Sequence, residues 1–226
     1  MERLSFGIMC VLVISGSVSA RAASFDCTKA KSKIEKAICS DQNLSNLDEY
    51  LGRYYGGAAE TLKDGVVCLK SDQRTWVKTK RDACGPKVGC LTNAYLGRLA
   101  TLDGLQPGVT ALKNVELPSV PTLITTIPPA ADSPSAKPGK PMRVSGKMVY
   151  ETNDIYNQGY AVKPDGGKPK AFIFDMDFGS SPTHETVRAL TAQADNARYE
   201  VRGFVSIEGG ESGFDQGQCR YVYRLP

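Results

Sequence analysis

The chain has 226 residues, of which 28 are lysine or arginine and 24 are aspartate or glutamate, giving a net charge of +4. The two signs are interspersed along the sequence, so no segment has the dense positive field typical of proteins that bind nucleic acid. The length allows one large domain or two small ones.

Residues 1–22 have the pattern of a cleaved signal peptide. Arg3 supplies the positive start, residues 6–14 form an apolar run, and residues 20–22 read Ala-Arg-Ala, an A-x-A cleavage site. The apolar run is too short to span a bilayer, and neither Cys10 nor Cys27 has neighbours typical of lipid attachment. We therefore expect a soluble protein in the periplasm or outside the cell, without a membrane span.

Six of the seven cysteines follow the predicted signal peptide. Thiols in an oxidising compartment are expected to pair. The spacing includes no C-x-x-C motif and the chain has a single histidine, so a redox or zinc site is disfavoured. The cysteines are therefore interpreted as structural.

Residues 23–104 have the periodicity of a helical domain. In chain order we expect helices at 30–40, at 47–62 behind a cap at Ser45, from 71 to the Gly85-Pro86 breaker, and at 90–102. Each has one apolar stripe. The pattern indicates a small bundle built on helical hairpins.

Residues 105–141 are expected to form a linker. Eight of the thirteen prolines lie there. Proline fixes φ and pushes the preceding residue towards extended conformations. A semi-rigid, extended linker that lies along a domain surface is predicted.

Residues 142–226 change to a period of two. Strands are expected at 142–150, 158–163, 170–176, 199–207 and 218–225, with a helix at 182–194 after the third. This order is typical of an OB-fold, a small five-stranded barrel. The whole chain is thus predicted to be an α+β protein of two domains, helical first and OB-like second.

The helical segment also carries a set of short motifs. They are Phe25-Asp26-Cys27-x-Lys29-Ala30, Glu35-Lys36-Ala37-Ile38-Cys39, Leu44-x-x-Leu47-Asp48, Gln73-Arg74-x-Trp76, Arg81-Asp82-x-Cys84-Gly85 and Cys90-Leu91-x-x-Ala94-Tyr95-x-x-Arg98-Leu99. As a set they resemble the LprI-like lysozyme-inhibitor family over residues 24–104. The resemblance implies an exported helical domain braced by disulfides, and a protein that protects its bacterium by binding and blocking lysozyme.

Four cysteines belong to this family set, namely Cys27, Cys39, Cys84 and Cys90. Cys84 and Cys90 flank one turn and are close enough for a local bridge, which makes Cys27–Cys39 the default second pair. Cys68 and Cys219 remain, one in each predicted domain. We expect them to join the domains; the alternative is that one or both are free thiols.

The chain departs from the family pattern after its only tryptophan. The spacing from Trp76 to Arg81 is one residue longer than expected. This leaves Lys80 as a candidate for the place of the usual arginine.

Six residues are candidates for contact with a partner. They are Asp41, Asn43 and Asn46 in a predicted loop at 41–46, and Gln73, Arg74 and Trp76 on the third helix. Trp76 has two interpretations, a core anchor and a binding hot spot. Its apolar neighbours favour the core.

No catalytic site, cofactor or metal is expected. His184 is the only histidine, and no G-x-S-x-G motif accompanies it. The leading functional hypothesis is that the chain binds and blocks lysozyme. The alternative is an envelope module whose barrel binds a glycan or a small anion. The oligomeric state is left open by the sequence.

Overall fold

A computed structural model describes residues 23–106, 115–130, 138–152, 158–164, 171–175, 182–192, 196–205 and 213–226. The predicted signal peptide lies outside these residues. The described part of the chain combines a helical bundle with an antiparallel sheet. The α+β fold class is therefore confirmed.

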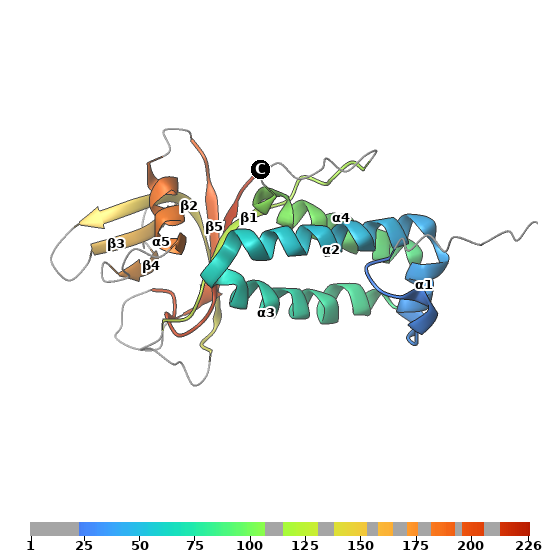
Figure 1. Ribbon diagram of the computed structural model, residues 1–226. Helices are drawn as coiled ribbons and strands as arrows, with labels where there is room; N and C mark the ends of the chain where they lie inside the picture. Colours follow the sequence, from blue (N-terminus) through green and yellow to red (C-terminus); the bar gives the residue numbers. More distant parts are fainter. Residues whose placement is uncertain are drawn as a thin grey trace, which may run out of the picture.

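The bundle is formed by α1 (Lys33–Ser40), α2 (Gln42–Leu62), α3 (Val66–Trp76) and α4 (Val88–Leu102). Figure 1 shows α2, α3 and α4 reaching the sheet with one end, while α1 lies at the far end. Ser32 and Glu35 form a capping box that starts α1. No helix of the described segments is long and apolar enough to cross a membrane.

The junction between α1 and α2 is tighter than the sequence indicates. Asp41 is the N-cap of α2, and its carboxylate accepts a hydrogen bond from the Leu44 amide at 3.0 Å. The predicted cap at Ser45 and loop at 41–46 are therefore wrong. Ser45 is buried inside α2 and donates to the Ile38 carbonyl at 2.9 Å. An earlier cap is favoured because it also brings Leu44 into the core.

The chain leaves α3 through a π-helical turn (Val77–Arg81). A π-turn takes up one more residue than an α-turn, and this one falls where the chain is one residue longer than the family pattern. Lys80 is exposed, whereas Arg81 is half-buried and bonded to Asp82 and Tyr95. Arg81, and not Lys80, therefore takes the inward position.

The described strands form one antiparallel sheet in the order β1-β6-β5-β2-β3-β4. They are β1 (Thr122–Ile127), β2 (Pro141–Thr152), β3 (Gln158–Pro164), β4 (Ala171–Asp175), β5 (Tyr199–Phe204) and β6 (Arg220–Arg224), with α5 (Pro182–Thr191) between β4 and β5. Among these strands the edges β1 and β4 do not pair with one another. The OB-like barrel stays a prediction.

Strand β1 lies within the segment predicted as a linker. It pairs with β6 from Thr122 opposite Arg224 to Ile127 opposite Arg220. Its extended conformation agrees with the proline pattern, but Leu123 and Ile127 are fully buried, so this stretch is part of the sheet. The division of the chain at 105 and 142 stays a prediction.

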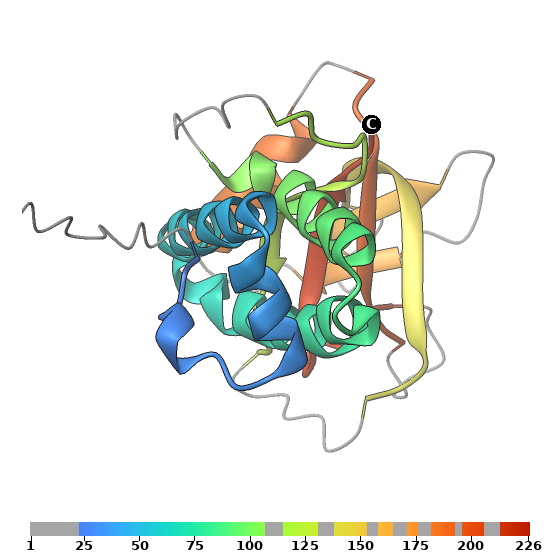
Figure 2. The same cartoon turned by 90° about the vertical axis from the view of Figure 1, so that its right-hand side faces the viewer.

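The two faces of the sheet pack against different partners. Leu123 of β1 and Tyr223 of β6 join the core of the bundle. Ile127 and Val222 join a second core with Val187 of α5. Val222 and Tyr223 are neighbours in β6 and so point to opposite faces. In β1 the register shift between Leu123 and Thr125 places Leu123 and Ile127 on opposite faces, so both strands contribute to both cores. Figure 2 looks along the bundle and shows its helices in front of the sheet.

The described cysteines form three disulfides, Cys27–Cys39, Cys84–Cys90 and Cys68–Cys219. These are the pairs that the sequence favours. Cys68–Cys219 joins α3 to the residue before β6. Beside it, Thr126 of β1 donates a hydrogen bond to the Gly65 carbonyl at 2.6 Å. The bundle and the sheet are thus connected both covalently and by polar contacts.

Candidate binding site

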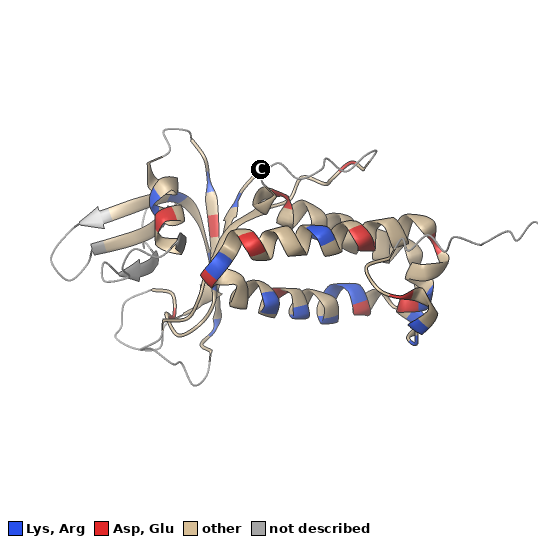
Figure 3. Cartoon of the chain, in the orientation of Figure 1, with Lys and Arg blue, Asp and Glu red and all other residues tan. Residues whose placement is uncertain are grey.

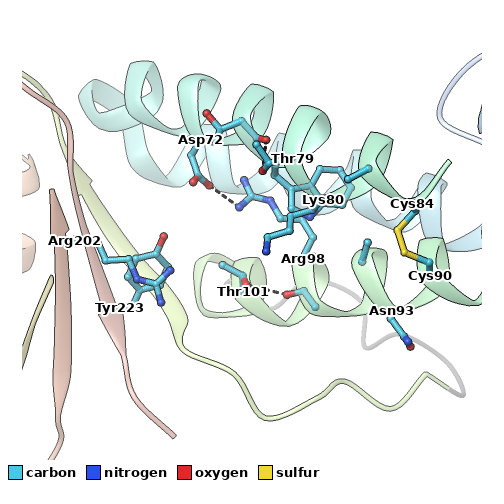
Figure 4. Close-up of a pocket in the computed structure, with 15 residues that line it drawn as sticks. Asp72, Thr79, Lys80, Cys84, Cys90, Asn93, Arg98, Thr101, Arg202 and Tyr223 are labelled. Atoms are coloured by element: carbon cyan, nitrogen blue, oxygen red, sulfur yellow. Dashed lines mark hydrogen bonds and ion pairs between the residues drawn. A yellow bond between two sulfur atoms is a disulfide. The ribbon is translucent and has the colours of Figure 1, made fainter. Parts of the chain in front are cut away.

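A pocket of about 610 Å³ opens between α3, α4 and the strands β5 and β6 (Figure 4). Sites for small molecules are typically about 300–1,000 Å³. The lining includes two aromatic rings, three cations, three threonine hydroxyls and one carboxylate: Trp76, Tyr223, Lys80, Arg98, Arg202, Thr75, Thr79, Thr101 and Asp72. We call it the bundle–sheet pocket.

Arg98 of α4 is the most buried cation of this pocket, with 5% of its surface exposed. Its Nη1 donates to Asp72 at 2.5 Å and its Nε to Gln73 at 2.9 Å. Its Nη2 is buried and has no hydrogen-bond partner among the described residues. Arg98 is therefore fixed by α3 while one donor stays unused.

The sheet side of the pocket is formed by Arg202 and Tyr223. The Arg202 guanidinium lies 4.1 Å from the centroid of the Tyr223 ring, a cation–π geometry. Arg202 also pairs with Glu200 at 2.5 Å. Burial, with the nearby charge of Asp72, raises the pKa of Tyr223 to about 12. Tyr223 is thus a neutral, mostly apolar wall at ordinary pH.

Trp76 forms part of the opposite wall. It is 9% exposed, and its ring meets that of Tyr95 edge-on, with 5.5 Å between the ring centroids. This packing agrees with the core interpretation of Trp76. Because it also lines the pocket, a ligand there would contact its remaining surface.

A buried polar network lies deeper in the bundle. The Asp48 carboxylate accepts hydrogen bonds from the Ser24 amide at 2.8 Å, the Ser24 hydroxyl at 2.5 Å and the Tyr95 hydroxyl at 2.6 Å. Burial and the charge of Asp48 raise the pKa of Tyr95 far above its ordinary value. Burial opposes the charge of Arg81, but its bond to Asp82 and its attraction to Tyr95 raise the pKa of Arg81. This network attaches the start of the described chain to the bundle.

A row of cations runs along the outer face of α3 and into the π-turn that follows it. Lys70, Arg74 and Lys78 are all exposed and follow one another at a spacing of four residues, which places them on one face of a helix. Figure 3 shows Lys and Arg concentrated along this helix. We call these three residues the basic stripe.

The six predicted contact residues take different roles. Gln73 and Trp76 support the bundle–sheet pocket, and Arg74 belongs to the basic stripe. Asp41 is a helix cap, and the side-chain oxygen Oδ1 of Asn46 accepts a hydrogen bond from Gln42 Nε2 at 3.0 Å. Asn43 is exposed at the start of α2.

Of the residues that line the pocket, only Trp76 is among the six predicted contacts, and sequence reasoning missed Arg98, Arg202 and Tyr223 among the others. Arg98 belongs to the family motif set, and this membership is the sequence signal that could have marked it as a candidate. Arg202 and Tyr223 come from strands whose packing against α3 and α4 no local pattern reveals. In the described part of the chain, no three His, Cys, Asp or Glu side chains gather as a metal site would require.

No family model and no solved structure matches the chain. Curated proteins that it resembles include lipoprotein LprI of Mycobacterium bovis and lipoprotein LprI of two Mycobacterium tuberculosis strains. The identity is 28% over 114 residues, which are 49% of this chain and 52% of each relative. The chain is thus similar to LprI over about half of its length. It spans about half the length of these relatives. Their description as lipoproteins, together with the three disulfides of this chain, indicates an exported protein.

Proposed function

We propose that this LprI-like chain is an exported, non-enzymatic protein that binds and blocks lysozyme. The observation that carries the proposal is the similarity to LprI, which agrees with the motif set of the helical segment. The cysteines of that set form disulfides, Cys27–Cys39 and Cys84–Cys90, within the bundle.

The basic stripe is the surface best suited to this target. Lysozyme cleaves its glycan in a cleft where two carboxyl groups act. An inhibitor must cover that cleft, and exposed cations would be attracted by its carboxylates. Lys70 and Arg74 on α3 and Lys78 on the π-turn present three such charges in a row.

The bundle presents these side chains on a rigid scaffold. Two disulfides lie within it, and α3 is fixed to α4 through Asp72 and Arg98. Little backbone freedom is lost when such a surface binds, so more of the contact energy contributes to affinity. We propose Arg74 as the central contact and Asn43 as a peripheral one.

A charge reversal tests this surface. The chain without residues 1–22 should slow the clearing of a cell-wall suspension by lysozyme. Arg74→Glu should raise the concentration needed for half inhibition about tenfold, because it places like charges opposite one another. Lys163→Glu is the matched control, since Lys163 is exposed on β3, away from the bundle. The proposal fails if lysozymes of several classes are not slowed by the unmodified protein.

The bundle–sheet pocket favours a second candidate function, an envelope module that binds a small ligand. The alternative hypothesis drawn from the sequence has such a ligand bind the OB-like barrel. We retain the barrel itself as a proposal for residues 142–226. The pocket instead lies between that segment and the bundle.

A further inference from the structure

The bundle–sheet pocket contains two cationic donors that no described residue uses. One is the buried Arg98 Nη2. The other is the Lys80 ammonium, for which the described residues provide no ion pair or hydrogen bond. Figure 4 shows both side chains pointing into the space between α3 and α4. An unpaired buried donor is costly, so a ligand oxygen that accepts from Arg98 would be stabilised.

The charges around these donors are unbalanced. The lining has three cations and one carboxylate, Asp72, which is already paired with Arg98. Glu200, next to the lining, pairs with Arg202. Lys80 and the free edge of Arg98 therefore favour an anionic group, and a carboxylate can accept from both.

The pocket also offers hydrogen-bond acceptors. The Thr75, Thr79 and Thr101 hydroxyls donate to helix carbonyls four residues earlier, at 3.1, 2.8 and 2.8 Å. Their hydrogens are thus occupied, and the lone pairs of their oxygens are available to accept. Ligand hydroxyl groups are donors that fit this arrangement. The rings of Trp76 and Tyr223 provide apolar walls for the carbon skeleton.

We propose that the bundle–sheet pocket binds an acidic saccharide, with its carboxylate on Lys80 and Arg98 and its hydroxyls on the threonines. A sugar acid combines an anion, several hydroxyl donors and a compact carbon ring in one molecule. The inference does not depend on lysozyme binding, because the basic stripe is a different surface.

Trp76 provides a direct readout, because it is the only tryptophan of the chain and lines the pocket. The chain without residues 1–22 is titrated with N-acetylmuramic acid while its tryptophan fluorescence is measured. N-acetylglucosamine, which lacks the carboxylate, and inorganic phosphate, which lacks the sugar, are titrated in parallel. We expect a saturable change with the acid and at least about tenfold weaker binding of the other two.

A pair of lysine variants shows where the ligand binds. Lys80→Ala should weaken binding of N-acetylmuramic acid about tenfold. Lys87→Ala removes the same charge from an exposed residue outside the lining and should leave the affinity unchanged. The proposal is overturned if the acid leaves Trp76 fluorescence unchanged, if N-acetylglucosamine or phosphate binds as tightly as the acid, or if both variants weaken binding equally.

Discussion

Asp48 is the buried carboxylate on which the polar network of the bundle depends. It is 6% exposed and accepts three hydrogen bonds, two from Ser24 and one from Tyr95. In Asp48→Asn, an amide NH₂ would face at least one of these donors. We expect the variant to lose about 2 kcal/mol of unfolding free energy, because hydrogen bonds to a charged acceptor are strong and a buried donor would be left unpaired. Urea denaturation measures this loss.

Glu49→Gln is the matched control for this substitution. Glu49 is partly exposed, and its described ion pair with Arg53 spans 3.8 Å. A surface pair of this kind contributes little, so its loss should change the unfolding free energy by less than about 0.5 kcal/mol. Equal losses in both variants would show that the Asp48 network does not stabilise the bundle.

At the scale of single residues, the sequence indicates a core residue more readily than it indicates which partner a polar side chain binds. Trp76 is recognisable as a core residue because its neighbours are apolar. Gln73 looks like a surface residue, yet it fixes Arg98 from the preceding helix. No local pattern pairs residues that are 25 positions apart, so this role becomes visible only in three dimensions.

The π-turn after α3 is the element in which this chain departs from its family pattern. If the turn takes up one inserted residue, its removal should let α3 continue as an α-helix with Arg81 still facing Tyr95. We expect deletion of Lys78, an exposed residue of the turn, to change the unfolding free energy by less than about 1 kcal/mol. Thermal or urea unfolding measures the change.

Deletion of Arg53, an exposed residue inside α2, provides the comparison. In a regular α-helix each residue advances about 100°. The deletion therefore turns Tyr54, Ala58 and Leu62, which are all buried, away from the core, and the bundle should fail to fold. A deletion of Lys78 that is equally damaging would mean that the π-turn is not a tolerated insertion.

The elements of the chain were predictable to different degrees. The long helices follow from their apolar stripes, and Gly85, with φ of 59°, ends the third predicted helix because glycine adopts this conformation without strain. Strand β1 was hidden among prolines, since its partner β6 lies almost a hundred residues later in the chain. Such pairing depends on long-range contacts rather than on local propensity.

At the scale of the whole molecule, the bundle and the sheet meet across β1 and β6. Leu123 and Tyr223 enter the bundle core, and the bundle–sheet pocket takes its lining from both parts. The sequence predicts that Cys68–Cys219 joins the two parts, but it does not reveal that they also pack against one another. The binding of a ligand in this pocket would therefore depend on how firmly the bundle and the sheet are held together.

The Cys68–Cys219 disulfide is the covalent link between the bundle and the sheet, and its removal tests how much this link stabilises the protein. In the chain-entropy account, a crosslink stabilises more when it closes a longer loop. This bond spans 151 residues, whereas Cys84–Cys90 spans 6. We expect the double substitution of Cys68 and Cys219 by serine to cost about 5 kcal/mol of unfolding free energy, against about 2 kcal/mol for Cys84 and Cys90.

Urea unfolding followed by Trp76 fluorescence and by circular dichroism should give one shared transition in the intact protein. Without the long-range bond, the bundle signal from Trp76 should separate from the signal of the whole chain. Equal losses in the two double variants would contradict the entropic account, and coincident transitions would show that the packing of β1 and β6 joins the parts without the crosslink.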